Sequence, residues 1–578
     1  MKKHLLLVIP ACSLLALFSF RLLTDQKNKT AVLSIATADG RSSIACAPPA
    51  GKTVRTDANG KFAPVFPGWG TYHYGIHTSS DSAQFYFDQG LNLYYSYHLT
   101  EALASFKEAA RYDTSCAMAY WGQALAMGPY YNSYYYEMPV TIFPVLEKMN
   151  QALPGTEKEK GLVKAMNERY SADTSDTKRS ELNRAYARSL AALIKKHPAD
   201  ADIKALYVDA VMLEHTWDFW QSDGTPKTWT PELVDYCDDI LKQHPNHPAA
   251  LHYQIHLVEA SRHPEKALAH ADKLKDALPG VPHMVHMSSH MYQRNGLYAK
   301  GVEINEDASS LLIRYDSLAS HLNLGIFGLT HYDAVGAFCA MNANMYEKGR
   351  EMSGHLHDIL STNYKSRLSS TFFQYLYMMP MFNAVRSGKW NEVLAMPPPD
   401  KDLRYARLLD HFGKGLAALR KADTMNAIHH LGQLQELTDD KSLASRNLPF
   451  NTAMESAKIA EAILAGELLL AHGKHDAGIQ SLENAVSLED NMIYREPKEW
   501  PIPARHFLGA GLIKLNKAVK AAQVYRDDLV RNPGNGWAFL GLYQSLAMQH
   551  KGREADKYRE ALKLAFATAD EQPPASVY

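Results

Sequence analysis

The chain has 578 residues, of which 46% are hydrophobic and 21% are charged. This composition is typical of a folded protein with a sizeable core and excludes a largely disordered one. Lysines and arginines total 61 against 62 aspartates and glutamates, and there is no basic run, so we expect no nucleic-acid partner.

The N-terminus, MKKHLLLVIPACSLLALFSFR, has two lysines followed by an apolar run from Leu5 to Phe20 and then Arg21. This order is typical of an export signal or a short membrane anchor. The apolar run is slightly shorter than the roughly 17–25 residues of a membrane-spanning helix. We expect an exported protein, either periplasmic or anchored to the inner membrane and facing the periplasm, with no other contact to a membrane. Cleavage and retention of the segment both stay open.

From Ser82 onward, apolar residues recur at spacings of three and four, which predicts helices almost throughout. A repeat lies within this pattern, in which a glycine precedes an alanine by 12 residues and an aromatic side chain follows. The register is shared by three stretches, which contain Gly90, Ala102 and Phe106; Gly509, Ala521 and Tyr525; and, in the next unit, Trp537, Leu540 and Gly541.

These residues and spacings resemble the tetratricopeptide repeat, a 34-residue helix pair. In that repeat, small residues lie where the two helices touch and an aromatic side chain fills the pocket between them. The resemblance covers roughly residues 82–570 and implies an all-α fold, a right-handed superhelical α-solenoid of stacked helix pairs. Further units fit the same register around Ala117–Gly128, Ala249–Leu274, His283–Ala308, His331–Gly349, Gly388–Val393, Gly415–Ala427 and Gly466–Ala485.

More narrowly, the chain resembles a family of exported bacterial tetratricopeptide proteins with a histidine-rich central repeat pair. The stretches that carry this resemblance are GIHTSSDSAQFYFDQGLNLYYSYHLTEALASF, CAMAYWGQALAMGP, HPAALHYQIHLVEAS, VPHMVHMSSHMYQRNGLYAKGVEIN and PARHFLGAGL with NPGNGWAFLGL. The resemblance implies the fold and export, and it implies no activity. Relatives tend to have a His-Asn-x-His step where this chain has His331, Tyr332, Asp333 and Ala334, so the second histidine of that step is missing here.

The predicted organisation has six parts. We expect a signal peptide or membrane anchor over residues 1–21, a linker and entry segment over 22–70, N-terminal repeats with a looser insertion over 71–235, central histidine-rich repeats over 236–360, C-terminal repeats over 361–570 and a tail over 571–578. The looser region includes an aromatic segment, Thr216 to Trp229, which we expect to be a loop packed on the solenoid.

Histidines are concentrated between residues 244 and 290. Residues three and four apart share a helix face, so His283, His286 and His290 form one stripe that Arg294 continues. His252, His256 and Glu259 form another. In the repeat register, His283, His286 and His290 are the second, fifth and ninth residues of their unit. His252, His256 and Glu259 are the fifth, ninth and twelfth residues of the preceding unit. By the resemblance, these positions lie on the first helix of each pair and line the concave groove. His331 falls on a second position, and His506 and Trp121 fall on fifth positions.

Two histidines at i and i+4 can share a metal ion, and nitrogen and oxygen ligands suit zinc, copper or iron. We therefore name His252, His256, His286 and His290 as candidate ligands of one transition-metal ion. Glu259 is a further ligand, an orienting group or a general base. The other predicted groove residues are His283, Arg294, His506 and Trp121. No catalytic residue is assigned.

Two other interpretations stay open: a groove that binds a peptide without a metal, and histidines that only stabilise the helix packing. The five cysteines are scattered without a CxxC pair, which disfavours a disulfide framework or a cysteine zinc site. Phosphate-binding loops and the serine-hydrolase elbow are absent from the sequence. We expect a binding and scaffolding protein of the cell envelope with a protein or peptide partner. The alternative is a metal-dependent envelope enzyme, a hydrolase or an oxidase, that uses the same histidines.

Overall fold

The computed structural model describes residues 54–132, 136–152, 155–322, 324, 328–445 and 451–578. By its internal contacts the chain divides into two units, Met1–Arg41 and Ser42–Tyr578, and all described residues belong to the second. The predicted signal peptide or anchor and most of the predicted linker lie outside the described residues. No helix among those residues is long and apolar enough to cross a membrane.

The described part of the chain is built from helices, and its only strand-like pairing is an isolated bridge between Trp220 and Pro226. The α-helices are α1 (Asp81–Tyr95), α2 (Leu99–Tyr112), α3 (Ala117–Met127), α4 (Ile142–Gln151), α5 (Glu157–Glu168), α6 (Arg179–Lys196), α7 (Ala201–Glu214), α8 (Thr230–Gln243), α9 (Pro248–Val258), α10 (Leu268–Ala277), α11 (Pro282–Arg294), α12 (Tyr298–Leu318), α13 (Leu329–Ala343), α14 (Tyr346–Thr362), α15 (Thr371–Tyr377), α16 (Met379–Arg386), α17 (Trp390–Ala395), α18 (Arg404–Arg420), α19 (Thr424–Thr438), α20 (Ala453–Ala471), α21 (His475–Asp490), α22 (Ala504–Lys514), α23 (Ala518–Arg531), α24 (Gly536–Met548), α25 (Gly552–Asp556) and α26 (Arg559–Ala565). Short 3₁₀ helices are η1 (Pro264–Ala267), η2 (Ser320–Leu322), η3 (Lys365–Ser369) and η4 (Lys441–Ala444).

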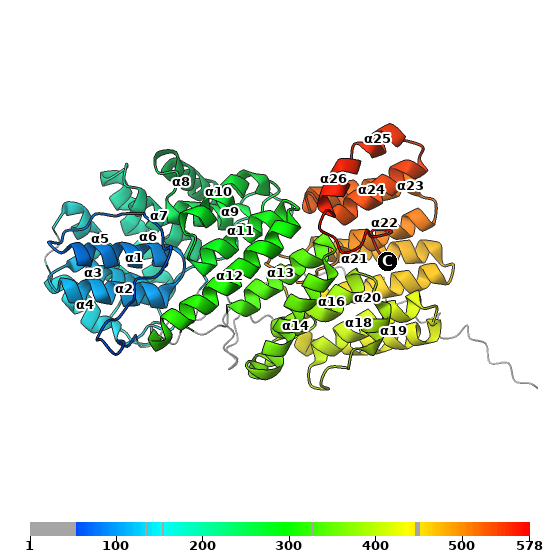
Figure 1. Ribbon diagram of the computed structural model, residues 1–578, viewed down its shortest axis with the longest axis horizontal. Helices are drawn as coiled ribbons and strands as arrows, with labels where there is room; N and C mark the ends of the chain where they lie inside the picture. The colour runs from blue at the N-terminus through cyan, green and yellow to red at the C-terminus, as the bar shows by residue number, and fades with distance from the viewer. Residues whose placement is uncertain (1–53, 133–135, 153–154, 323, 325–327, 446–450) are drawn as a thin grey trace, which may run out of the picture. The chain divides into compact units, whose positions relative to one another are not determined.

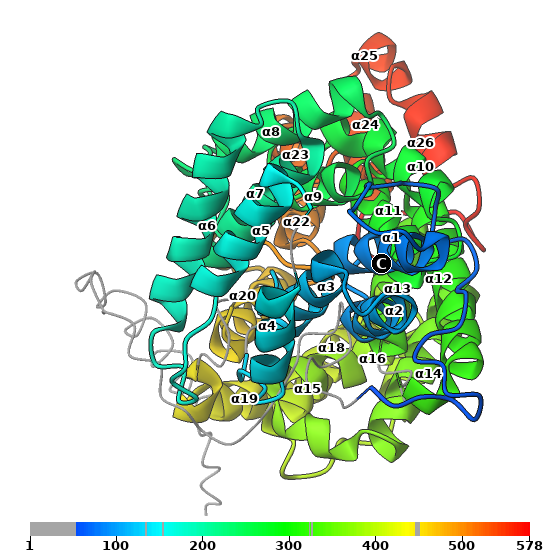
Figure 2. The ribbon, with the colours of Figure 1, turned by 90° about the vertical axis from the view of Figure 1, so that its left-hand side faces the viewer.

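Helices that follow one another along the chain pack side by side, as α11, α12 and α13 do in Figure 1. The turned view shows the same neighbour relation for α6 and α7 (Figure 2). A helix pair buries its apolar face only by stacking on the next pair. The buried apolar side chains form two large clusters, one within residues 54–324 and one within residues 298–555, and a small third cluster of residues from α11, α12 and α13. The predicted all-α solenoid of helix pairs is confirmed.

Glycines lie where paired helices approach most closely. A Cβ atom at Gly90 would come within 2.8 Å of the Phe106 ring, and one at Gly122 within 2.3 Å of the same ring. Gly509 and Gly541 have the same relation to Tyr525, with 2.3 and 2.0 Å. In these two units, one aromatic side chain of the second helix therefore fills space that the glycines of two neighbouring helices leave open.

The described residues of the part in which the looser insertion is expected are largely helical. They include α4 to α8, and consecutive helices from α5 to α8 pack on one another as in the rest of the array. The segment from Thr216 to Trp229 is a loop, as predicted. It packs against α9, because the indole of Trp220 donates to the Leu257 carbonyl at 2.7 Å.

The two ends of the described chain pack on its interior. The backbone N–H of Gly280 donates to the Gly68 carbonyl at 3.0 Å, and the Phe66 ring lies 4.9 Å from that of Tyr315. These contacts bring the entry segment onto the central helices, and α1 packs against α9. At the other end, the tail residue Ser576 bonds to the Tyr525 hydroxyl at 2.5 Å.

Candidate metal centre

Six imidazoles meet in the interior of the central repeats. They come from three successive first helices: His252 and His256 from α9, His283, His286 and His290 from α11, and His331 from α13. Their side chains are buried, with exposures of 0–5%. α9 begins with Pro248 in its first turn and α11 with Pro282, and the i, i+4 spacing then places each histidine pair on one face.

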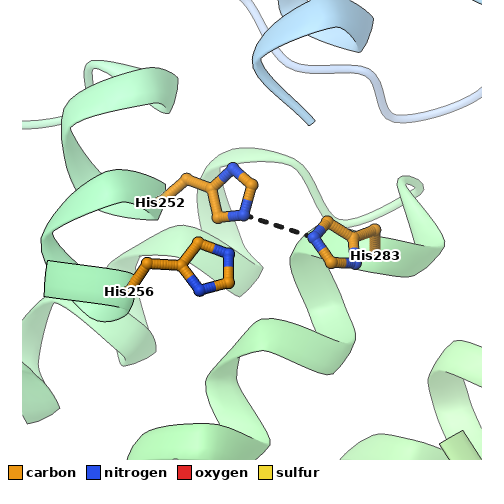
Figure 3. Close-up of side chains that lie close together, drawn as sticks. All are labelled: His252, His256 and His283. Atoms are coloured by element: carbon orange, nitrogen blue, oxygen red, sulfur yellow. Dashed lines mark hydrogen bonds between the residues drawn. The ribbon is translucent and has the colours of Figure 1, made fainter. Parts of the chain in front are cut away.

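His252, His256 and His283 form the first set of imidazoles. Figure 3 shows their rings converging on one space, with the α9 pair facing His283. The Nε2 atoms of His252 and His283 are 3.2 Å apart. Nδ1 of His252 donates to the Tyr95 carbonyl at 2.7 Å, at the C-terminal end of α1. In the described part of the chain, Nε2 of His256 and Nδ1 of His283 have no hydrogen-bond partner.

His286, His290 and His331 form the second set. The Nε2 atoms of His286 and His290 are 3.0 Å apart. Nδ1 of His286 lies 2.6 Å from the Asn305 side-chain oxygen on α12. The amide nitrogen of Asn305 donates to the Gly301 carbonyl at 2.7 Å, which fixes the orientation of the amide. His286 therefore carries its proton on Nδ1, and its Nε2 lone pair points at His290.

Glu259, the residue that follows α9, joins the two sets. One carboxylate oxygen accepts from Nδ1 of His256 at 3.0 Å and the other from Nδ1 of His290 at 2.6 Å. Because a carboxylate only accepts, both imidazoles carry their protons on Nδ1. Four of the six histidines thus donate an Nδ1 proton to an oxygen and turn Nε2 inward, the arrangement typical of metal-ligating histidine.

Burial keeps these imidazoles neutral. Desolvation lowers the pKa of His256 and of His331 to about 3 and that of His290 to about 4. Desolvation, reinforced by neighbouring imidazoles, holds the pKa of the other three, His252, His283 and His286, well below the ordinary value. Neutral imidazole is the form that binds metal ions.

Arg294 continues the histidine face of α11 and bonds to three backbone carbonyls. Its guanidinium donates to the carbonyls of Glu259 at 2.8 Å, Ser261 at 3.0 Å and Arg531 at 2.9 Å. These bonds fix the end of α9 relative to α11 and to the C-terminal end of α23. The position of the Glu259 carboxylate depends on this anchor.

The five predicted groove residues, His283, Arg294, Glu259, His506 and Trp121, are buried, with exposures of 0–7%. His506 also makes its contacts elsewhere: it accepts from Arg386 at 3.1 Å and donates to Asp528 at 3.2 Å. Trp121 packs near Phe87 in the N-terminal core, with ring centroids 6.5 Å apart.

The four predicted ligands do meet, but they divide between two sets, which the sequence reasoning did not foresee. It left His331 and Asn305 out of the site. His331 carried a usable signal, because it occupies the same second position of its unit as His283. The contact of His252 with the Tyr95 carbonyl could not be predicted from the sequence. The carbonyl is a backbone group 157 residues away, and no side-chain pattern identifies it.

No protein-family model and no curated protein matches the sequence. Similar solved structures include the human IFIT1 dimer with m7Gppp-AAAA, with 11% identity, a TM-score of 0.33 and coverage of 86% of this chain and 92% of that one. The Cut9–Hcn1 hetero-tetramer of APC/C has 11% identity, a TM-score of 0.26 and coverage of 86% and 79%. Yeast Tom70 has 15% identity, a TM-score of 0.25 and coverage of 78% and 92%. At these values the likeness concerns the general helical architecture and nothing of the site.

Proposed function

We propose that the chain is a metal-binding protein of the cell envelope that holds a transition metal in its buried histidine cluster. The observation that carries the proposal is the 3.0 Å approach of Nε2 of His286 to Nε2 of His290. Both Nδ1 protons are already donated, to Asn305 and Glu259, and burial keeps both rings neutral. Two lone pairs therefore face each other.

Such an approach is repulsive on its own and favourable around a cation. In a tetrahedral site with metal–nitrogen bonds of 2.0–2.1 Å, two ligand nitrogens lie about 3.3–3.4 Å apart. The distances of 3.0 and 3.2 Å within the two sets are close to this value. Histidines that only stabilise packing would instead pair each ring nitrogen with a complementary protein group, as His506 does.

Elemental analysis of the purified full-length chain tests the proposal. We expect zinc, copper or iron in the wild type and its loss in His286→Ala/His290→Ala. The matched control, His73→Ala/His263→Ala, removes two imidazoles that are 64% and 65% exposed, and it should keep the metal. A wild type that holds no metal, even after reconstitution with zinc and copper at neutral pH, would defeat the proposal.

Export is the second part of the proposal, and the N-terminal lysines followed by the apolar run from Leu5 to Phe20 support it. Cell fractionation with mass determination of the mature N-terminus tests it. Recovery of the intact chain in the cytoplasm would contradict it.

A protein partner would bind outside the cluster, where large apolar side chains are exposed, such as Val519 at 69% and Val530 at 61% on α23.

A metal-dependent enzyme is the second candidate, and Glu496 favours it. This side chain is 4% exposed, and neither carboxyl oxygen has a hydrogen-bond partner among the described residues. Burial, followed by the negative charge of Glu259, raises the pKa of Glu496 well above its ordinary value. This shift favours the protonated form of Glu496, which is a proton donor. Hydrolase or oxidase activity that follows the metal content of the wild type and the double variant would support this candidate.

A further inference from the structure

The six imidazoles divide into two complete ligand sets. His252, His256 and His283 each offer a nitrogen, and these three atoms lie within 4.8 Å of one another. His286, His290 and His331 do the same. Each set alone has the three nitrogen ligands that a transition-metal site with an open position requires.

The two sets have the same construction, displaced by one repeat. In each, the fifth and ninth residues of one unit meet the second residue of the next unit. His252 and His256 on α9 thus meet His283 on α11, and His286 and His290 on α11 meet His331 on α13. Stacked repeats place equivalent positions in equivalent environments, so the geometry that builds one site builds the other.

One carboxylate serves both sets. Glu259 accepts the Nδ1 proton of His256 in the first set and of His290 in the second, at 3.0 and 2.6 Å. Such a shared outer partner orients one ligand of each set at the same time. Nitrogens of His256 and His290 and an oxygen of Glu259 themselves lie within 4.8 Å of one another, so the two sets are adjacent.

On this basis we propose that the cluster is a two-metal centre that binds two monovalent copper ions, one in each set. The inference rests on the proposed metal-binding function and deepens it. The imidazoles are neutral, and the carboxylate that contacts both sets is partly offset by the nearby guanidinium of Arg294. The cost of burying an ion grows with the square of its charge, so two monovalent ions cost about a quarter as much as two divalent ions. Copper is among the metals that imidazole binds, and it has a monovalent state.

Anaerobic titration of the full-length chain with Cu⁺ against a competing chelator tests the inference. We expect two Cu⁺ per wild-type chain. His252→Ala/His283→Ala and His286→Ala/His331→Ala each disable one set and leave both imidazole partners of Glu259 in place, so each variant should bind one. The exposed pair variant, His73→Ala/His263→Ala, should still bind two.

One Cu⁺ per wild-type chain, lost in both pair variants, would overturn the two-metal centre while the metal-binding function stands. Two Zn²⁺ without any Cu⁺ would overturn the assignment to copper. A wild type that binds no metal at all would defeat both proposals. The wild-type stoichiometry decides between one ion and two even where a variant fails to fold.

Discussion

Glu259 is a buried carboxylate whose two oxygens each accept an imidazole N–H, from His256 and from His290. A glutamine would keep one acceptor and turn an NH₂ donor toward the other imidazole N–H. We therefore expect Glu259→Gln to weaken metal binding about 10–100-fold, the range for loss of an outer partner of a metal ligand. Competition titration against a chelator measures the change.

Glu265→Gln is the matched control for this variant, because Glu265 contacts the exposed ring of His263 at 3.1 Å. It should bind metal as the wild type does. If Glu259→Gln also bound metal with wild-type affinity, Glu259 would not orient the ligands.

His506 is as deeply buried as the cluster, but both of its ring nitrogens have partners, Arg386 and Asp528. His506→Ala would leave these two buried charged groups with one partner fewer. We expect it to lower the free energy of unfolding by about 1–3 kcal/mol and to leave the metal content unchanged. Thermal unfolding and elemental analysis of the same sample check both parts. Loss of metal in this variant would mean that the site extends further than the six imidazoles.

The sequence predicted part of the cluster because helix geometry alone relates residues three and four apart. That rule placed His252 with His256 and His286 with His290. It could not show that these pairs belong to different sets, because the division depends on which neighbouring helix supplies the third imidazole. His331 could have been found from its second position in the next unit, because successive first helices pack side by side, as α11 and α13 do.

At the scale of the helix pair, glycines decide how closely two helices approach. A Cβ at Gly122 in α3 would lie 2.3 Å from the Phe106 ring, whereas one at Gly432 in α19 would meet nothing within 4 Å. We expect Gly122→Ala to destabilise the protein by about 1–3 kcal/mol through overpacking. Gly432→Ala should stabilise it by about 0.8–1.0 kcal/mol, the difference in helix propensity.

Thermal unfolding of the two glycine variants beside the wild type checks this pair of predictions. Shifts of the melting temperature in opposite directions are expected. A rise of the melting temperature in both variants would mean that helix propensity, and not the contact with Phe106, governs both positions.

The pairing of helices was predictable at this scale because the small and aromatic residues recur at fixed spacings. The helices between residues 133 and 235 were not recognised as regular pairs. α6 has no glycine within it, and it carries charged residues such as Arg184 and Arg188, so the repeat signature is weak there. Their pairing follows instead from buried apolar residues such as Leu190 and Leu206, whose spacing defines a helix face without defining a repeat.

At the scale of the whole described chain, the cluster depends on residues far apart in sequence. The Tyr95 carbonyl comes from α1, Asn305 from α12 and the Arg531 carbonyl, which anchors Arg294, from α23. A metal bound here would therefore link α1, α9, α11, α12 and α13, and it would stabilise their packing by an amount that grows with the logarithm of its affinity for the folded state.

The same construction makes the metal-free protein sensitive to acid. In the unfolded chain an imidazole has a pKa near 6.5, whereas burial lowers the pKa of His256 and His331 to about 3 and that of His290 to about 4. Between pH 6.5 and 4 the unfolded state therefore binds more protons than the folded state. Stability is fully present above pH 6.5 and is lost as the pH falls, by about 1.4 kcal/mol per pH unit for each such imidazole.

We expect the melting temperature of the metal-free wild type to fall steadily between pH 7 and pH 5. His256→Ala/His331→Ala, which lacks two of these imidazoles, should show a shallower fall over the same range. Metal should raise the melting temperature at pH 7 and lose this effect only as the pH falls to about 4 and below, where the folded imidazoles gain protons. A melting temperature independent of pH would show that the buried imidazoles gain no protons on unfolding, and the neutral cluster that the metal site requires would then be wrong.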